Sequence, residues 1–222
     1  MLIPYNKSKA LTGFTHEQLL ELTGIYGVHG KKVFFQWLGN GLIGYRIEVN
    51  NVTNELTITI KSPLKVNLTV IKELTVIVKS KTEIYNASFL LHDWAKNSNG
   101  NYGFKRLYKE IITARKLGIK RITLWAYGNY REIKKWTGYL IWGKYGFTMY
   151  EVNEILKFQF QMVADNLPHK VINSLVVTKE GTAYWKHTGW DWKGEFETQP
   201  TSSHFKILKR YARGKKIALS KI

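Results

Sequence analysis

The chain has 222 residues, enough for one sizeable core or two small ones, and its 44% hydrophobic and 14% aromatic content excludes a disordered protein. No apolar stretch approaches the roughly 18 residues that cross a bilayer, and the first residues lack the basic region and apolar run of a secretion signal. The absence of cysteine excludes disulfides and thiolate metal sites. We therefore expect no membrane partner.

Positive charge is the strongest signal in the composition. The chain carries 34 Lys and Arg against 16 Asp and Glu, a net charge of +18, which favours polyanionic partners, although a merely solvated Lys-rich surface gives the same count. Residues 103–146 hold eleven basic and two acidic residues, and residues 205–222 hold seven basic and none. From these two segments we predict phosphate contacts with nucleic acid by Lys105, Lys109, Lys116, Lys209, Arg210, Arg213, Lys215 and Lys216.

The first 91 residues predict one helix followed by an antiparallel meander. Thr15 and Gln18 are spaced as a capping box before a leucine-rich helix. From Lys32 the apolar period changes to two, with a hairpin turn at residues 39–41 and an interruption at Pro63. The strands are expected at residues 33–38, 42–49, 55–61, 68–70, 74–78 and 84–91.

A helix and a buried strand follow a polar loop at residues 94–102. Phe104, Leu107, Tyr108 and Ile111 have helical spacing, so we expect an amphipathic helix over 104–117 that ends at Gly118. The next elements are expected as a strand at 121–127, a helix at 131–142 that stops before Gly146 and Phe147, and a strand at 148–150.

The remaining residues have a different character, so we expect two domains: a core at residues 1–150 and a helical, Trp-rich, basic extension at 151–222. A helix is expected at 153–164, and residues 170–177 are ambiguous. Ser202 or Ser203 is expected to cap a last helix that runs through Tyr211.

The order of these elements resembles the GNAT N-acetyltransferase fold. The residues that carry the resemblance are Gly100 and Gly103 before the amphipathic helix, the sequence KLGIKRITL at 116–124, and KYGF at 144–147. It covers roughly residues 12–150 and is strongest over 100–147. It implies an α+β fold, with a mixed or antiparallel central sheet flanked by helices.

Two parts of the sequence depart from the family pattern. The family loop reads Arg or Gln, two residues, Gly, one residue, and Gly or Ala, and its backbone amides hold the pyrophosphate of acetyl-CoA. Residues 97–102 keep only the middle Gly and end in the bulky phenol of Tyr102.

The second departure concerns the proton donor. In the family, the proton donor is often a Tyr four residues before the Gly of the Gly-Phe pair. Trp142 stands there, and an indole N–H is far too weak an acid.

The departures resemble GNAT-like domains of tailed-phage virion and head-morphogenesis proteins. The supporting residues are Gly138, Tyr139, Trp142 and the pair Gly146–Phe147, followed by the Trp-rich stretch and a Ser-rich helix start. This resemblance implies a non-catalytic structural or interaction protein without cofactor. Its implied partners are other protein subunits of a larger assembly, a virion with DNA nearby.

The alternative is a cytoplasmic, acetyl-CoA-dependent N-acetyltransferase. The resemblance would then assign cofactor binding to Gly100, Tyr102, Gly103 and Phe104, and catalytic roles to Tyr139, Tyr145 and Asp93. A pair formed by His92 and Asp93 at a strand end is more often bonded to local backbone than catalytic.

Three tryptophans and six histidines complete the candidate residues. Trp185, Trp190 and Trp192 are able to stack on bases, but we favour a small core or an intermolecular interface, where Trp is enriched. The histidines have no metal-ligand spacing, so no metal is expected.

Overall fold

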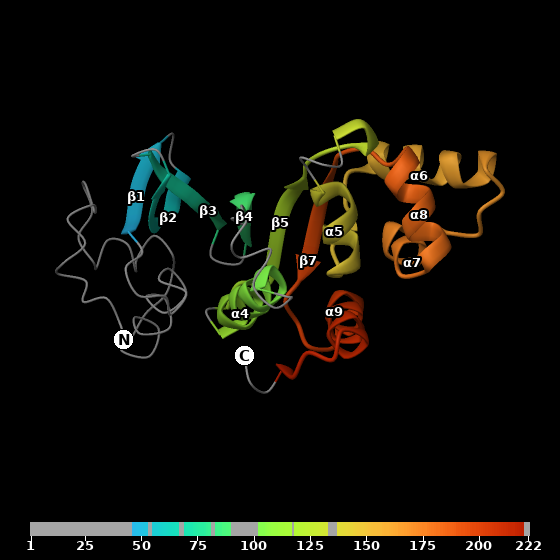
Figure 1. The fold of residues 1–222 in the computed structure, drawn as a ribbon. Coiled ribbons are helices and arrows are strands. Elements are labelled where there is room, and N and C mark those ends of the chain that lie inside the picture. Colours follow the sequence, from blue (N-terminus) through green and yellow to red (C-terminus); the bar gives the residue numbers. More distant parts are fainter. Residues whose placement is uncertain are drawn as a thin grey trace. The chain divides into compact units, whose positions relative to one another are not determined.

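The computed structural model describes residues 46–52, 55–66, 69–80, 83–89, 102–116, 118–132 and 137–219 (Figure 1). Strands and helices both contribute, so the chain belongs to the α+β class, as expected. It divides into two compact units, Met1–Ile122 and Thr123–Lys221, and the boundary falls inside strand β5. The helix expected at 15–22, the first predicted hairpin and most of the loop at 94–102 lie outside the described residues.

Four antiparallel strands form the sheet of the first unit: β1 (Arg46–Val52), β2 (Glu55–Val66), β3 (Thr69–Ser80) and β4 (Glu83–Phe89). The predicted meander is confirmed over these strands, because alternating apolar residues suit a sheet. Strand β2 continues through the interruption expected at Pro63. The pairing with β3 is irregular between Lys61 and Lys65, where proline has no N–H to donate.

The predicted amphipathic helix is α4 (Tyr102–Lys116), which begins two residues earlier than expected. Its apolar stripe is fully buried at Phe104, Leu107 and Ile111. Beyond its last residue, Gly118 adopts a φ of +81° and donates its N–H to the carbonyl of Arg115 at 3.0 Å. This is the left-handed cap that glycine makes without steric cost.

The second unit combines three strands with several helices. Its elements are β5 (Arg121–Ala126), η2 (Tyr130–Glu132), α5 (Gly138–Lys144), β6 (Thr148–Met149), α6 (Val152–Ala164), α7 (Ile172–Val176), α8 (Lys179–Thr188), β7 (Trp192–Glu197) and α9 (Ser203–Gly214). Strand β7 lies beside β5 (Figure 1) and has β6 on its other side. It is antiparallel to β6, with Met149 opposite Gly194. The segment expected to be helical therefore contributes a central strand.

The core of the second unit joins residues from both sides of position 150. The backbone carbonyl of Tyr139 accepts hydrogen bonds from the indole Nε1–H of Trp185 at 3.1 Å and of Trp192 at 2.8 Å. The ring of Phe147 packs on that of Phe196, with centroids 5.2 Å apart. The compact units therefore differ from the domains expected at 1–150 and 151–222.

Two of the three tryptophans predicted to lie at an intermolecular interface are instead buried in this core. Trp185 and Trp192 have no exposed side-chain surface, so neither reaches another molecule in this fold. Their burial has a physical reason, because each indole N–H donates to an internal acceptor, the backbone carbonyl of Tyr139. Only Trp190 is half-exposed, and its role at an interface stays a prediction.

The ambiguous segment at 170–177 contains the short helix α7, which one buried amide attaches to its neighbours. Asn173 Nδ2 donates to the carbonyl of Gly143 at 2.7 Å and to that of Phe147 at 2.9 Å. These carbonyls lie at the end of α5 and before β6, so one side chain fixes α7 against the turn between them. Five residues alone are too few for a stable helix, and tertiary contact decides this one.

The last helix, α9, begins as predicted. Ser202 is its N-cap, and the hydroxyl accepts the N–H of Phe205 at 3.1 Å. His204 is buried, and its Nδ1 accepts the N–H of Glu197 at 2.8 Å. The helix runs to Gly214, three residues beyond the expected end at Tyr211.

Two glycines provide a matched test of this packing. A Cβ on Gly181 would lie 2.1 Å from the carbonyl oxygen of Leu175, whereas a Cβ on Gly214 would meet nothing within 4 Å. We expect Gly181→Ala to lower the free energy of unfolding by about 1–3 kcal/mol through overpacking. Gly214→Ala should raise it by about 0.5–1 kcal/mol through helix propensity. Urea unfolding of the two variants checks the sign of each change, and equal effects would contradict the packing around α8.

Candidate functional site

The two candidate acids of the enzyme alternative are held in structural contacts. Tyr139 is fully buried, its hydroxyl donates to the carbonyl of Lys186 at 3.2 Å, and burial raises its pKa. Tyr145 packs against Tyr211 with ring centroids 5.0 Å apart. Burial, and then the neighbouring Tyr211, raise the pKa of Tyr145 far above its usual value. Both phenols are thus weaker proton donors than a free tyrosine.

Trp142 occupies the family donor position and is a core residue. Its side chain is only 9% exposed and packs edge-on against Phe147, with ring centroids 5.3 Å apart. The third catalytic candidate, Asp93, lies outside the described residues. Nothing among the described residues at this position therefore offers a proton to a departing thiolate.

The candidate cofactor residues lie at the start of α4. Tyr102 begins the helix, Gly103 and Phe104 are buried in its first turn, and Gly100 lies outside the described residues. The first turn carries no acidic residue, so the positive end of the helix dipole is not neutralised there. A helix start without acidic residues is able to bind a phosphate group, as the acetyltransferase alternative requires.

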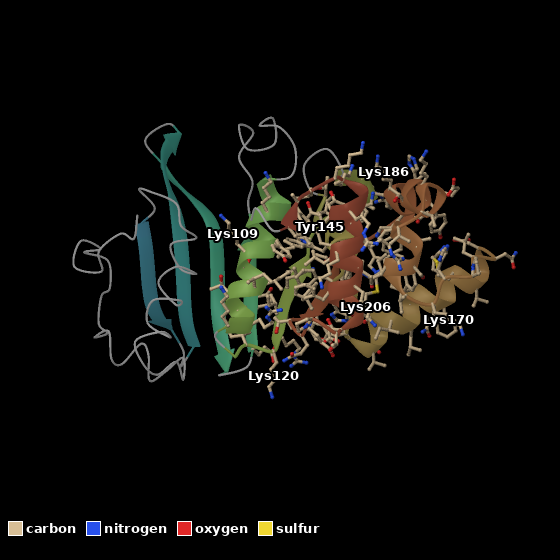
Figure 2. The ribbon with its side chains drawn as sticks, turned by 90° about the horizontal axis from the view of Figure 1, so that it is seen from below. Lys109, Lys120, Tyr145, Lys170, Lys186 and Lys206 are labelled. Atoms are coloured by element: carbon tan, nitrogen blue, oxygen red, sulfur yellow. The ribbon has the colours of Figure 1, made fainter. Side chains whose placement is uncertain are left out.

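Three predicted polyanion-binding residues lie on one face of α4. Lys105, Lys109 and Lys116 are exposed, and their spacing of four and seven residues places them on the same side of a helix. Exposed Lys120 follows the helix, and Figure 2 labels it together with Lys109. The first unit therefore presents a row of cations along α4.

The other predicted cations lie on α9 and directly after it, in the second unit. Lys209 extends over the ring of Phe205, with Nζ 5.2 Å from its centroid. The end of a helix favours positive charge because its last carbonyls are unpaired. All five predicted residues are exposed: Lys209, Arg210, Arg213, Lys215 and Lys216.

Lys215 also belongs to a group of three lysines from three helices or their ends, here called the lysine cluster: Lys144, Lys186 and Lys215. Lys144 ends α5, Lys186 lies on α8 and Lys215 is the C-cap of α9. Burial, followed by the positive charges of Lys186 and Lys215, lowers the pKa of Lys144. The ammonium groups of Lys186 and Lys215 therefore both repel that of Lys144.

Packing contacts keep the lysine cluster together. The hydroxyl of Tyr139 on α5 donates to the backbone carbonyl of Lys186, and the ring of Tyr145 packs on that of Tyr211. The N–H of Lys215 in turn donates to the carbonyl of Tyr211 at 3.0 Å. Two ion pairs between described residues join Arg121 to Glu83 and Lys193 to Glu151, and neither neutralises the cluster. A bound anion would relieve the repulsion.

Two features of the site were missed by reasoning from sequence. Lys144 and Lys186 lie 42 positions apart, and no local sequence pattern predicts that they come together.

An exposed aromatic group in the second unit was also missed: Trp125, Tyr127 and Tyr130 are 49%, 46% and 41% exposed. The alternation of Trp125 and Tyr127 along a predicted strand was the available signal, because such residues share a face.

An arginine accompanies the exposed aromatic group. Arg131 donates from Nε to the hydroxyl of Tyr130 at 3.0 Å and lies over its ring. Trp125 Nε1 donates to the carboxylate of Asp191 at 2.8 Å, which fixes the indole. Flat exposed rings beside a cation suit contact with an unpaired base.

Among the described residues, no group of three or more His, Cys, Asp or Glu is placed to hold a metal ion, and no helix is long and apolar enough to span a membrane. Comparison of the chain with protein-family models, curated proteins and solved structures gave no match. The chemistry of the described side chains is therefore the basis on which a function is inferred.

A single substitution tests the lysine cluster. The pKa of Lys144 is lowered, so its charged form is less favourable in the folded than in the unfolded chain, and the cost is fully present below that pKa. Lys144→Gln should therefore raise the melting temperature at neutral pH by about 1–2 °C, because the partial burial of this ammonium group and its screened repulsion together cost about 0.5 kcal/mol.

Inorganic phosphate supplies the second measurement for this variant. At constant ionic strength, phosphate in place of chloride should raise the melting temperature of the wild type more than that of Lys144→Gln. Lys170→Gln, which removes an exposed lysine elsewhere in the second unit, serves as the control. Equal behaviour of the three proteins would show that the cluster has no special affinity for anions.

Proposed function

We propose that this chain is a non-catalytic structural or interaction protein with a degenerate GNAT-like fold. In this proposal it belongs to a larger assembly, a phage virion, and contacts the phosphates of nearby nucleic acid. The observation that supports contact with a polyanion is the lysine cluster, in which the fold brings Lys144, Lys186 and Lys215 together. The carboxylates of the described ion pairs, Glu83 and Glu151, bind other cations and do not neutralise the cluster.

The order of the described elements supports the GNAT-like part of the proposal. An antiparallel meander, β1–β4, is followed by α4, β5, α5, a Gly146–Phe147 pair and β6. This is the order on which the resemblance is based. A fold alone does not assign an activity, so the absence of catalysis is argued from the side chains.

The contacts of three aromatic residues support a non-catalytic role. Tyr139 and Trp142 are buried, and Tyr145 packs against Tyr211, so each contributes to the core rather than to an exposed reaction centre. Raised phenol pKa values reduce the acidity that protonation of a thiolate leaving group requires.

Salt-dependent binding tests the nucleic-acid contact. We expect duplex DNA of random sequence to bind with an affinity that falls steeply as salt increases, because phosphate contacts release counterions. Replacing all three lysines of the cluster by glutamine should lower the slope of log affinity against log salt by about 0.9 for each phosphate that is no longer neutralised, about 2.7 in total. Fluorescence anisotropy over a salt series measures both quantities.

A charge-matched triple variant provides the control. Replacing exposed Lys170, Lys179 and Lys193 by glutamine removes the same net charge from other parts of the second unit. This control should keep most of the slope if the cluster itself, and not net charge alone, binds the phosphates. Affinity that does not depend on salt, or an equal decrease in both triple variants, would contradict the proposal.

The second candidate is an acetyl-CoA-dependent N-acetyltransferase, which the first turn of α4 favours because it has no acidic residue. A ligand at 100 times its dissociation constant would stabilise the fold by about 2.7 kcal/mol, which is several degrees of melting temperature. Under our proposal, millimolar acetyl-CoA leaves the melting curve unchanged. A clear rise, with coenzyme A alone as the comparison ligand, would favour the enzyme.

A further inference from the structure

Four large apolar side chains are exposed along α6. Val152, Leu156, Phe160 and Val163 keep 67%, 44%, 72% and 75% of their surface accessible. Their positions are separated by four, four and three residues, so they form one stripe on a single helix face, here called the α6 stripe. Single exposed apolar residues are ordinary, but a contiguous stripe usually marks an interaction site.

The α6 stripe is not needed to hold α6 in its own unit. Phe158 and Met162 are each 1% exposed and supply the buried face of the helix. Phe158 packs on Trp185, with ring centroids 5.6 Å apart. The helix therefore has one apolar face for its own core and a second one exposed to water.

The few charged groups beside α6 favour a protein partner over a polyanion. Residues 151–165 contain three acids, Glu151, Glu154 and Asp165, and a single lysine, Lys157, which gives 1 − 3 = −2 in a chain of +18. The ammonium group of Lys157 lies over the ring of Trp190, 4.1 Å from its centroid. Lys193 pairs with Glu151 at 3.1 Å, so the surface beside the stripe is close to neutral. Two copies of such a basic chain repel each other least where the surface lacks the positive charge of the rest of the chain.

The spacing of the stripe is self-complementary in an antiparallel pair. When a twofold axis passes near position 158, Val152 of one helix faces position 163 of the other, and Leu156 faces position 160. Every apolar residue of the stripe then meets another one, as an isologous interface requires. The two helix dipoles are also antiparallel, so the N-terminal end of one α6 lies beside the C-terminal end of the other.

We propose that two copies of this chain associate by packing the α6 stripe of one copy against that of the other, with the helices antiparallel. This inference deepens the assembly part of the proposed function by naming one partner surface, and it does not use the cations that contact nucleic acid. One pair of 13-residue helices buries little area, so we expect a weak dimer with a dissociation constant on the order of 1–100 μM.

Sedimentation equilibrium of the full chain, from about 1 to about 200 μM protein, tests the association. The wild type should shift from 25.8 kDa to twice that mass as its concentration rises. The double variant Phe160→Ser, Val163→Ser should remain a monomer, or weaken the dimer at least about tenfold. The control is Val171→Ser, Val177→Ser, two residues exposed to 49% and 47% outside α6, and it should dimerise like the wild type.

Engineered cysteines test the orientation, because the chain has none of its own. Positions 152 and 163 are separated by eleven residues, about 16 Å along a helix, which is far beyond the reach of a disulfide. A mixture of Val152→Cys and Val163→Cys should therefore form a mixed cross-linked dimer under mild oxidation, whereas neither variant alone should. Self-linking of either variant alone would indicate parallel helices and overturn the antiparallel pair.

The outcomes separate this inference from the proposed function. A wild type that is monomeric at every concentration, or that dimerises as well after the stripe is changed, overturns the α6 dimer. An association only with a different protein would also overturn it. Loss of salt-dependent DNA binding with an intact dimer contradicts the nucleic-acid contact alone. Melting temperatures of both double variants close to that of the wild type will show that the exposed substitutions leave the fold intact.

Discussion

The second unit depends on one buried acceptor, the backbone carbonyl of Tyr139. A carbonyl oxygen has two lone pairs, and here the indole N–H groups of Trp185 and Trp192 occupy this acceptor. Because an indole buried without a partner is costly, the two largest side chains of the core are fixed relative to α5. The same tyrosine contributes its hydroxyl to the backbone of Lys186, so α5, α8 and β7 meet at a single residue.

This arrangement explains why the unit combines a buried aromatic core with a surface that carries clustered positive charge. Tyr145 and Tyr211 hold α5 against α9 through ring packing, and that contact also brings Lys144 near Lys215. The free energy of aromatic packing thus offsets the repulsion of clustered cations. A charge arrangement that destabilises the free protein is an advantage when an anion binds, because the ligand removes an existing cost.

Two kinds of surface are separated on the second unit. The lysine cluster and the end of α9 are cationic, whereas α6 is apolar with acidic residues at its ends. A cationic face suits phosphate, and an apolar face suits a protein, so the two proposed contacts do not compete for the same residues. Such a division fits a protein that connects components better than one that converts a substrate.

The sequence by itself determined the features that depend on local pattern. Alternation of apolar residues predicted strands such as β2, and helical spacing predicted α4 with Lys105 and Lys109 exposed. Ser202 or Ser203 was expected to cap the last helix, and the structure selects Ser202, whose hydroxyl accepts an N–H three residues away. Pro63 showed the limit of such rules, because the strand passes through it with an irregular register.

Tertiary structure alone decided the features that depend on distant partners. It placed β7 in the sheet and buried Trp185 and Trp192, because the carbonyl of Tyr139, about 50 positions away, supplies their acceptor. It also brought Lys144 to Lys186. The α6 stripe has a different reason: a helix with apolar residues on two faces does not reveal from its sequence which face the core covers. In the folded unit, Phe158 packs on Trp185 and its face of α6 is buried, so the side chains of the stripe remain exposed to water.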